Sequence, residues 1–137
     1  MHERARSCAM LKIFLVEDSP LVRQRITALI GAIKGVEIVG EAKDASDALS
    51  GIAAREADVV IVDLRLTGGS GLDVLAGLAQ SSRPVITIVL TNYSSAVIRE
   101  ACLSAGANYF FDKTSEFNLA RDAIERIART RPASTAD

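Results

Sequence analysis

The amino-acid sequence predicts an α/β fold with one open, five-stranded parallel sheet and helices on both of its faces. Five short apolar segments alternate with five longer amphipathic segments between residues 11 and 129. The third and fourth apolar segments, 58–62 (DVVIV) and 85–90 (VITIVL), are nearly continuous Val, Ile and Leu. Such runs are typical of parallel strands buried on both faces. Five strand–helix units with right-handed crossovers are too few to close an eight-stranded barrel, so the predicted sheet is open.

The other three predicted strands are short apolar segments of the same kind, bounded by polar or turn-forming residues. They are expected at residues 11–16 (LKIFLV), 36–41 (VEIVGE) and 108–111 (NYFF). One helix is expected after each of the five strands, which accounts for nearly the whole chain as a single domain.

Capping residues mark where the predicted helices begin and end. Ser19 followed by Pro20 predicts the start of the first helix, since the hydroxyl caps it and proline suits the first helical position. Asp44 is expected to cap the second helix, and Ser115 to open the fifth. Gly106 is expected to stop the fourth helix.

Apolar residues at helical spacing predict the face that each helix presents to the sheet. The first stripe is Val22, Ile26, Leu29, Ile30 and Ile33; the second is Ala48, Leu49 and Ile52; the third is marked by Leu72, Leu75, Leu78 and Ala79; the fourth is Ile98, Ala101, Cys102 and Ala105; and the fifth, which ends near Arg129, is Phe117, Ala120, Ile124 and Ile127.

Composition excludes several classes of protein. The chain has 137 residues, 49% of them hydrophobic, and a net charge of −1, so it lacks the basic field that direct nucleic-acid binding needs. No apolar run approaches the roughly 18 residues of a membrane span. Cys8 and Cys102 have neither metal-ligand spacing nor a disulfide framework, which favours a cytoplasmic location. We expect residues 1–10 to be a flexible extension, residues 11–130 the domain, and residues 131–137 a flexible tail.

Polar side chains follow four of the five predicted strands. Glu17 and Asp18 come after the first strand, Asp63 ends the third, Thr91 follows the fourth, and Lys113 lies just past the fifth. In open parallel sheets, ligands bind at the carboxyl ends of the strands. We therefore expect three acids, one hydroxyl and one ammonium group to meet at this edge.

These residue types indicate phosphoryl chemistry with a divalent cation. Three adjacent carboxylates repel one another unless a cation compensates them. Mg²⁺ prefers oxygen ligands and is typically held by one or two carboxylates, waters and phosphate oxygens. Lys113 and Thr91 can each bind an anionic oxygen, and an aspartate in this setting can attack phosphorus. This interpretation explains why Asp63 interrupts an apolar run.

The sequence resembles the receiver domain of two-component response regulators from about residue 11 to residue 129. The resemblance rests on the acidic pair in LVEDSP, the aspartate in VIVDLRLTGGSGLDVL with Gly71 eight residues on, the threonine in VLTN and the lysine in AGANYFFDK. It implies a flavodoxin-like, doubly wound (βα)5 fold with strand order 2-1-3-4-5.

The resemblance also implies roles for individual residues. Asp63 is the expected phosphoacceptor, with Thr91 as the switch hydroxyl and Lys113 as the phosphate-binding lysine. Phe110 matches the switch aromatic. The expected Mg²⁺ ligands are Asp18, Asp63 and the backbone carbonyl of Arg65, with Glu17 acting mostly through water.

Four positions depart from the usual pattern of the family. Thr67 and Thr114 stand where proline is common, and Phe110 lacks the hydroxyl of the commoner tyrosine. A trans Lys113–Thr114 bond is expected, since a cis bond before a residue other than proline costs about 3–4 kcal/mol. Asn92 replaces a small residue, and with Arg65 and Tyr93 it is expected at the mouth of the site.

The implied function is that of a signalling switch rather than an enzyme. A sensor histidine kinase or a histidine phosphotransfer protein would phosphorylate Asp63 with Mg²⁺, and the signal would pass to an unknown downstream protein. Phe110, Val97 and Leu103 place the expected output surface on the fourth helix, fifth strand and fifth helix. The chain has no room for an output domain, and its origin in a longer regulator stays open.

Two alternatives remain. One is a degenerate receiver that binds its partner without phosphorylation, which Asn92 keeps open. The other is a Mg²⁺-dependent phosphohydrolase; such enzymes commonly carry a second acid two residues after the nucleophile, where this chain has Arg65.

Overall fold

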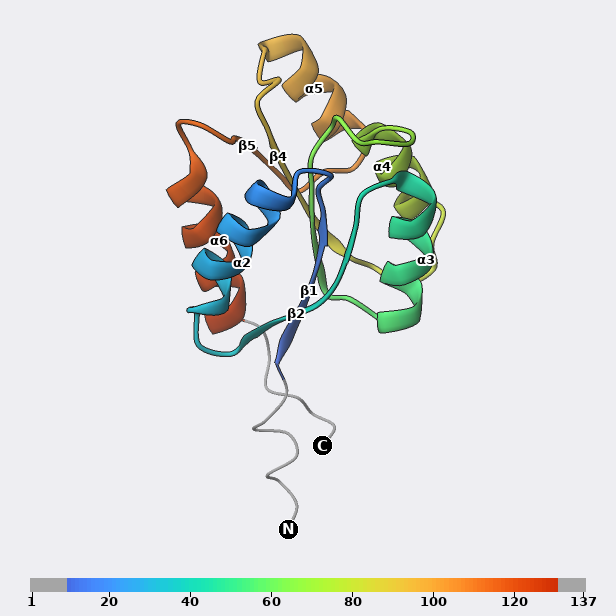
Figure 1. Cartoon of the computed structure of the whole chain (residues 1–137). Helices are drawn as coiled ribbons and strands as arrows, with labels where there is room; N and C mark the ends of the chain where they lie inside the picture. Colours follow the sequence, from blue (N-terminus) through green and yellow to red (C-terminus); the bar gives the residue numbers. More distant parts are fainter. Residues whose placement is uncertain (1–9, 131–137) are drawn as a thin grey trace.

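A computed structural model describes residues 10–130 as a five-stranded parallel sheet flanked by helices (Figure 1). The sheet has the order β2-β1-β3-β4-β5, so the prediction of a doubly wound fold with this strand order is confirmed. The elements are β1 (Leu11–Val16), α2 (Pro20–Gly31), β2 (Val36–Ala42), α3 (Ala45–Arg55), β3 (Val59–Val62), α4 (Gly71–Ala79), β4 (Ile86–Thr91), α5 (Ala96–Ser104), β5 (Tyr109–Asp112) and α6 (Phe117–Thr130). The expected flexibility of residues 1–9 and 131–137 lies outside the described residues.

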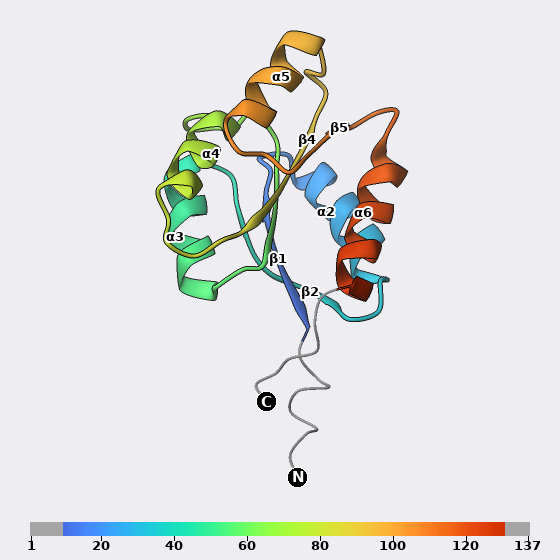
Figure 2. The same ribbon diagram turned by 180° about the vertical axis from the view of Figure 1, so that it is seen from behind.

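The helices form two layers, one on each face of the sheet. Helices α2 and α6 cover one face, and α3 and α4 lie on the other, with α5 near the edge where β4 and β5 lie (Figures 1 and 2). Side chains of β1 alternate between the layers: Ile13 and Leu15 belong to the core under α2 and α6, and Phe14 and Val16 to the core under α3, α4 and α5. Both faces of the central strands are therefore buried, as their continuous apolar character predicts.

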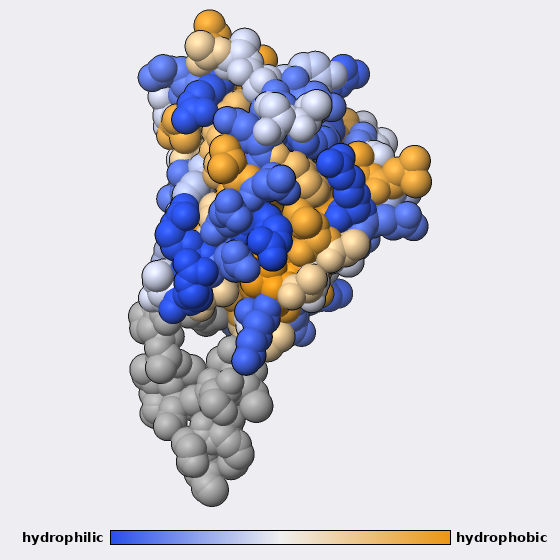
Figure 3. All heavy atoms as spheres, turned by 90° about the vertical axis from the view of Figure 1, so that its left-hand side faces the viewer, coloured by the Kyte–Doolittle hydropathy of each residue, from blue (hydrophilic) through white to orange (hydrophobic). Residues whose placement is uncertain are grey.

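The side of the molecule that carries α2 and α6 has apolar surface between charged side chains (Figure 3). Leu21 on α2 is 76% exposed and Leu119 on α6 is 47% exposed. No helix within residues 10–130 has the length and hydropathy needed to cross a membrane.

Every expected strand lies within one residue of its observed bounds, and the helices differ from expectation at two ends. Helix α2 ends at Gly31, although its expected apolar stripe ran to Ile33. Helix α6 begins at Phe117 rather than at Ser115. The carboxylate of Asp112 explains the delay, because it accepts hydrogen bonds from the backbone N–H groups of Thr114 and Ser115 at 2.8 and 2.9 Å. A side-chain hydrogen bond from Ser94 and these two bonds lower the pKa of Asp112 to about 2. The chain therefore completes a turn before the helix starts.

Three side chains of the expected apolar stripes face solvent instead. Leu72 is 42% exposed and Ala79 is also exposed, because the buried face of α4 is formed by Gly71, Val74 and Leu75. Ala101 is exposed while Cys102 is fully buried, so α5 packs through the i, i+4, i+7 series that includes Cys102. Burial raises the pKa of the Cys102 thiol, as expected for an unreactive core cysteine.

Candidate functional site

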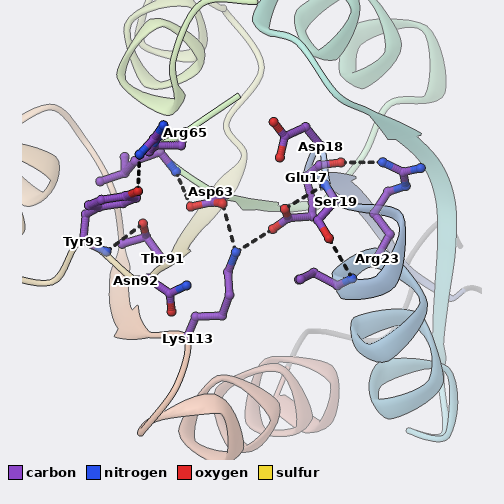
Figure 4. A network of polar contacts seen from close by, with 12 residues as sticks. Glu17, Asp18, Ser19, Arg23, Asp63, Arg65, Thr91, Asn92, Tyr93 and Lys113 are labelled. Atoms are coloured by element: carbon purple, nitrogen blue, oxygen red, sulfur yellow. Dashed lines mark hydrogen bonds and ion pairs between the residues drawn. The ribbon is translucent and has the colours of Figure 1, made fainter. Parts of the chain in front are cut away.

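The carboxyl ends of β1, β3, β4 and β5 bring the predicted polar side chains together at one edge of the sheet (Figure 4). Backbone hydrogen bonds continue the ladder just past the strands and fix these positions. The N–H of Asp63 donates to the carbonyl of Val16 at 3.0 Å, and that of Lys113 donates to the carbonyl of Thr91 at 2.8 Å. Residues distant in sequence therefore meet because their strands are neighbours.

Lys113 connects two buried carboxylates. Its Nζ atom lies 2.9 Å from Oε1 of Glu17 and 2.9 Å from Oδ2 of Asp63. Glu17 is 2% exposed, and Asp63 and Lys113 are each 7% exposed. The charge that compensates Asp63 at the end of its apolar run is therefore supplied, in this structure, by Lys113.

Burial and pairing act in opposite directions on the charged groups of this site. Burial raises the pKa of Glu17, and the hydrogen bonds from Lys113 and from the Ser19 N–H offset it only in part. Burial lowers the pKa of Lys113, but its hydrogen bonds to Glu17 and Asp63 and their charges together leave the pKa raised. Lys113 is thus held in its charged form between the two acids.

Asp63 is also fixed from the side of the following loop. Its Oδ1 atom accepts a hydrogen bond of 2.7 Å from the backbone N–H of Leu64. The backbone of Gly71 packs directly against it, so that a Cβ atom there would lie 2.5 Å from the carbonyl oxygen of Asp63. Glycine at position 71 is what permits α4 to begin this close to the site.

The site offers carboxylate and carbonyl oxygens, which are the donor atoms that a hard divalent cation prefers. Asp18 is half-buried, and its Oδ2 atom is bound by the Thr67 hydroxyl at 3.3 Å. Residues 10–130 contain no group of three or more acidic, His or Cys side chains arranged to hold a metal. Mg²⁺ usually takes only one or two carboxylates and completes its shell with carbonyls, waters and phosphate oxygens. Asp18, Asp63 and the backbone carbonyl of Arg65 are donors of this kind.

Thr91 ends β4 and Phe110 lies on β5, whereas Asp18 follows β1, on the opposite side of β3 in the sheet. Thr91 is fully buried, and its Oγ1 atom accepts a hydrogen bond of 3.2 Å from the N–H of Tyr93. Phe110 is 4% exposed, and the guanidinium carbon of Arg99 lies 5.9 Å from its ring centroid. The aromatic ring is thus inward in this structure. On α5, Val97 is 79% exposed and Leu103 is 40% exposed, as the sequence predicts.

Contacts between neighbouring loops lie beside the site. The Arg65 guanidinium donates a hydrogen bond to the Tyr93 hydroxyl, and its carbon atom lies 5.2 Å from the centroid of the Tyr93 ring. Asn92 accepts a hydrogen bond of 3.0 Å from the hydroxyl of Thr114. The described residues contain no cis peptide bond, which confirms the trans bond expected before Thr114.

Sequence reasoning missed the role of Arg23. Its guanidinium donates to the backbone carbonyl of Glu17 at 2.7 Å and pairs with Glu41 at 3.2 Å. It therefore holds the loop that carries the acidic pair. In the sequence, Arg23 is a basic residue in the first turn of a helix. Such residues are common on solvent-facing helices, so nothing in the sequence distinguished it.

The fold and the site define a class: open-sheet α/β domains whose polar site lies at the carboxyl ends of the strands. The family model of the response regulator receiver domain matches residues 13–125. The chain therefore belongs to the receiver domains of response regulators, which are signalling domains of two-component systems.

Similar proteins agree with this assignment. The chain is 31% identical over 89% of its length to the DNA-binding transcriptional activator DevR/DosR of Mycobacterium tuberculosis, covering 56% of that protein. It is 33% identical over 76% of its length to the response regulator UvrY of Escherichia coli, covering 48% of it. The chain thus spans about half the length of these relatives.

Solved structures of receiver domains superpose closely on the chain. A LuxR-family two-component response regulator from Aurantimonas has a TM-score of 0.81 at 28% identity, over 92% of this chain and 90% of that one. The signal receiver domain of a Mycobacterium tuberculosis response regulator has a TM-score of 0.80 at 27% identity, over 89% and 98% of the two chains.

Proposed function

We propose that this domain accepts a phosphoryl group on Asp63 from a phosphohistidine of a sensor histidine kinase or a histidine phosphotransfer protein. The observation that carries the proposal is the buried Asp63 carboxylate at a strand end, 2.9 Å from the Nζ atom of Lys113. A cation held beside a nucleophilic carboxylate is suited to bind the oxygens of an incoming phosphoryl group.

The transfer needs only one bond to form and one to break. A carboxylate oxygen of Asp63 attacks phosphorus, while the bond from phosphorus to the donor nitrogen breaks and its electron pair stays on the imidazole. Lys113 then binds one phosphoryl oxygen, and the Thr91 hydroxyl donates a hydrogen bond to another. Hydrolysis later returns Asp63 to its carboxylate, so the domain assists its own phosphorylation and dephosphorylation.

Mg²⁺ is the cofactor of this proposal. Asp18, Asp63 and the Arg65 carbonyl would hold it directly, and Glu17 mostly through water. When bound, the ion supplies positive charge that neutralises the acids and the phosphoryl oxygens. Asp18 suits this role because the hydrogen bond that its carboxylate accepts from the Thr67 hydroxyl is long, at 3.3 Å, and a cation can replace it.

Output is proposed to pass through the surface formed by α5, β5 and α6. Movement of the Thr91 hydroxyl toward the phosphoryl group vacates space beside Phe110, whose ring then has two available positions. Phosphorylation would bias these two states, as a switch requires. Val97 and Leu103 are the exposed apolar side chains of α5 that a downstream protein would contact.

Incubation with Mg²⁺ and a small phosphodonor such as phosphoramidate tests the proposal, with intact mass as the measurement. We expect one phosphoryl group on the native protein and none on Asp63→Asn, a variant of similar size without the carboxylate nucleophile. No mass change in the native protein would favour a degenerate receiver. Continuous turnover of varied phosphoesters would favour a phosphohydrolase.

A further inference from the structure

The two residues that flank Lys113 in the sequence are both bound to the loop after β4. The hydroxyl of Ser94 donates a hydrogen bond to Oδ2 of Asp112. The hydroxyl of Thr114 donates a hydrogen bond of 3.0 Å to Oδ1 of Asn92. Lys113 therefore lies between two contacts that join the same pair of loops, those after β4 and β5.

The carboxylate of Asp112 binds both loops at once. While its Oδ2 atom is bound by the loop after β4, its Oδ1 atom accepts hydrogen bonds from the backbone N–H groups of Thr114 and Ser115 at 2.8 and 2.9 Å. These bonds, the one from Ser94 foremost, lower the pKa of Asp112 to about 2, so the group is ionised at neutral pH. One side chain therefore orders the turn that contains Lys113 and connects it to the neighbouring loop.

Lys113 depends on this order because its single charge reaches two acids. Strand β5 ends at Asp112, so Lys113 is the first residue beyond the strand. Figure 4 shows its side chain extended toward Asp63 and Glu17, and its Nζ atom lies 2.9 Å from an oxygen of each. A lysine side chain is a flexible stem of four carbons, so the position of its backbone decides where the charge is held. A shift of the turn would therefore lengthen one or both contacts.

We propose that Asp112 is a positioning residue for phosphoryl transfer, because its carboxylate holds the turn that places the Lys113 ammonium group beside Asp63. This inference rests on the proposed function, since that ammonium group would bind an oxygen of the incoming phosphoryl group. Asp112 makes no bond to phosphorus and acts through the position of Lys113. Because Ser94 binds this carboxylate, the turn at Lys113 also follows any movement of the loop after β4.

Hydrogen exchange of the Lys113 ammonium group in the metal-free protein measures its position without any phosphorylation. In protein that contains ¹⁵N-labelled lysine, an ammonium group held by two buried hydrogen bonds exchanges its protons with water more slowly than an exposed one. The signal that is lost in Lys113→Met belongs to this group. The rate of phosphorylation by phosphoramidate and Mg²⁺, followed by intact mass, then measures the consequence for the reaction.

Variants at three positions separate the role of the carboxylate from general stability. Asp112→Ala removes the three hydrogen bonds described above, whereas Asp112→Asn keeps an amide oxygen for the two backbone donors and an amide N–H for the Ser94 hydroxyl. Ser94→Ala removes the bond between the loops alone, at an exposed position. Asp58→Ala is the matched control: its carboxylate also accepts a backbone hydrogen bond, of 2.8 Å from Lys12, but it precedes β3, at the opposite edge of the sheet from the site.

We expect Asp112→Ala to speed exchange of the Lys113 ammonium group and to slow phosphorylation, by about tenfold each, because three hydrogen bonds are lost and the charge is displaced. Ser94→Ala, which loses one hydrogen bond, should change both by about threefold, and it carries the test alone if Asp112→Ala does not fold. Asp112→Asn and Asp58→Ala should stay within about twofold of native in both measurements.

Unchanged ammonium exchange in Asp112→Ala and Ser94→Ala would overturn the positioning role. So would faster exchange with an unchanged rate of phosphorylation, or equal slowing of phosphorylation in Asp58→Ala. Absence of phosphorylation in the native protein, with the differences in ammonium exchange as expected, would instead overturn the proposed function.

Discussion

Replacing Lys113 by methionine removes the charge that compensates two buried carboxylates while keeping the apolar stem. Lys113 contacts Glu17 and Asp63 at 2.9 Å each, and all three residues are at most 7% exposed. Removing one partner of a buried ion pair costs about 3–5 kcal/mol. Burial already raises the pKa of Glu17, so the variant can relieve part of this penalty by protonating that carboxyl. We therefore expect a loss of about 3 kcal/mol, near the lower limit.

Urea unfolding in EDTA at neutral pH measures this loss. Lys34→Met is the matched control, since Lys34 is exposed, and it should change the free energy of unfolding by less than about 0.5 kcal/mol. The deficit of Lys113→Met should shrink as the pH falls and Glu17 becomes protonated. It should also shrink when Glu17→Gln is added. A loss below about 1 kcal/mol would refute the view that Lys113 compensates both acids.

Asp63→Asn should raise the stability of the metal-free protein, because one ammonium group, Lys113, then pairs with one buried carboxylate instead of two. Burial is the main cause of the raised pKa of Glu17, and the charge of Asp63 adds to it. Millimolar Mg²⁺ should raise the melting temperature of the native protein, and an unchanged value would count against the acidic site. The raised pKa of Lys113 means that its charge stabilises the fold below the ordinary lysine pKa, and that this contribution disappears as the pH rises through the raised value. As the pH of an alkaline buffer rises, the urea concentration at the unfolding midpoint should therefore fall more steeply for the native protein than for Lys113→Met. Gly71→Ala should slow phosphorylation and destabilise the fold, since its Cβ would lie 2.5 Å from the Asp63 carbonyl, whereas Gly31→Ala, with nothing within 4 Å, should do neither.

The sheet and the membership of the site follow from the sequence for a simple physical reason. The apolar run of β3 (Val59–Val62) requires burial on both faces, which implies parallel neighbours and helices on each side. Parallel strands end at one edge, so Glu17, Asp63 and Lys113 must meet there. The sequence does not show which of these charged groups pair with one another, because the pairing depends on distances between side chains.

The sequence predicted that Lys113 binds an anionic oxygen, but not that it bridges Glu17 and Asp63, as it does in the structure. Compensation of the acids by Mg²⁺ stays a prediction. The expected inward positions of Leu72, Ala79 and Ala101 were wrong, because several small or apolar residues in α4 and α5 fit more than one helical stripe. The start of α6 was misplaced because the Asp112 carboxylate competes with Ser115 for the role of ordering the turn. The contact between Arg65 and Tyr93 joins two loops, and no periodic pattern predicts contacts of that kind.

The central claim is that Asp63 carries the phosphoryl group, and locating the modified residue tests it most directly. An acyl phosphate is reduced by borohydride, which converts the phosphorylated aspartate to homoserine and leaves free carboxylates unchanged. Peptide mass spectrometry of protein treated with phosphoramidate, Mg²⁺ and then borohydride identifies the position. We predict homoserine at position 63 and unmodified Glu17 and Asp18. Phosphorylation with homoserine at position 18, or with no reduced residue at all, would contradict the account.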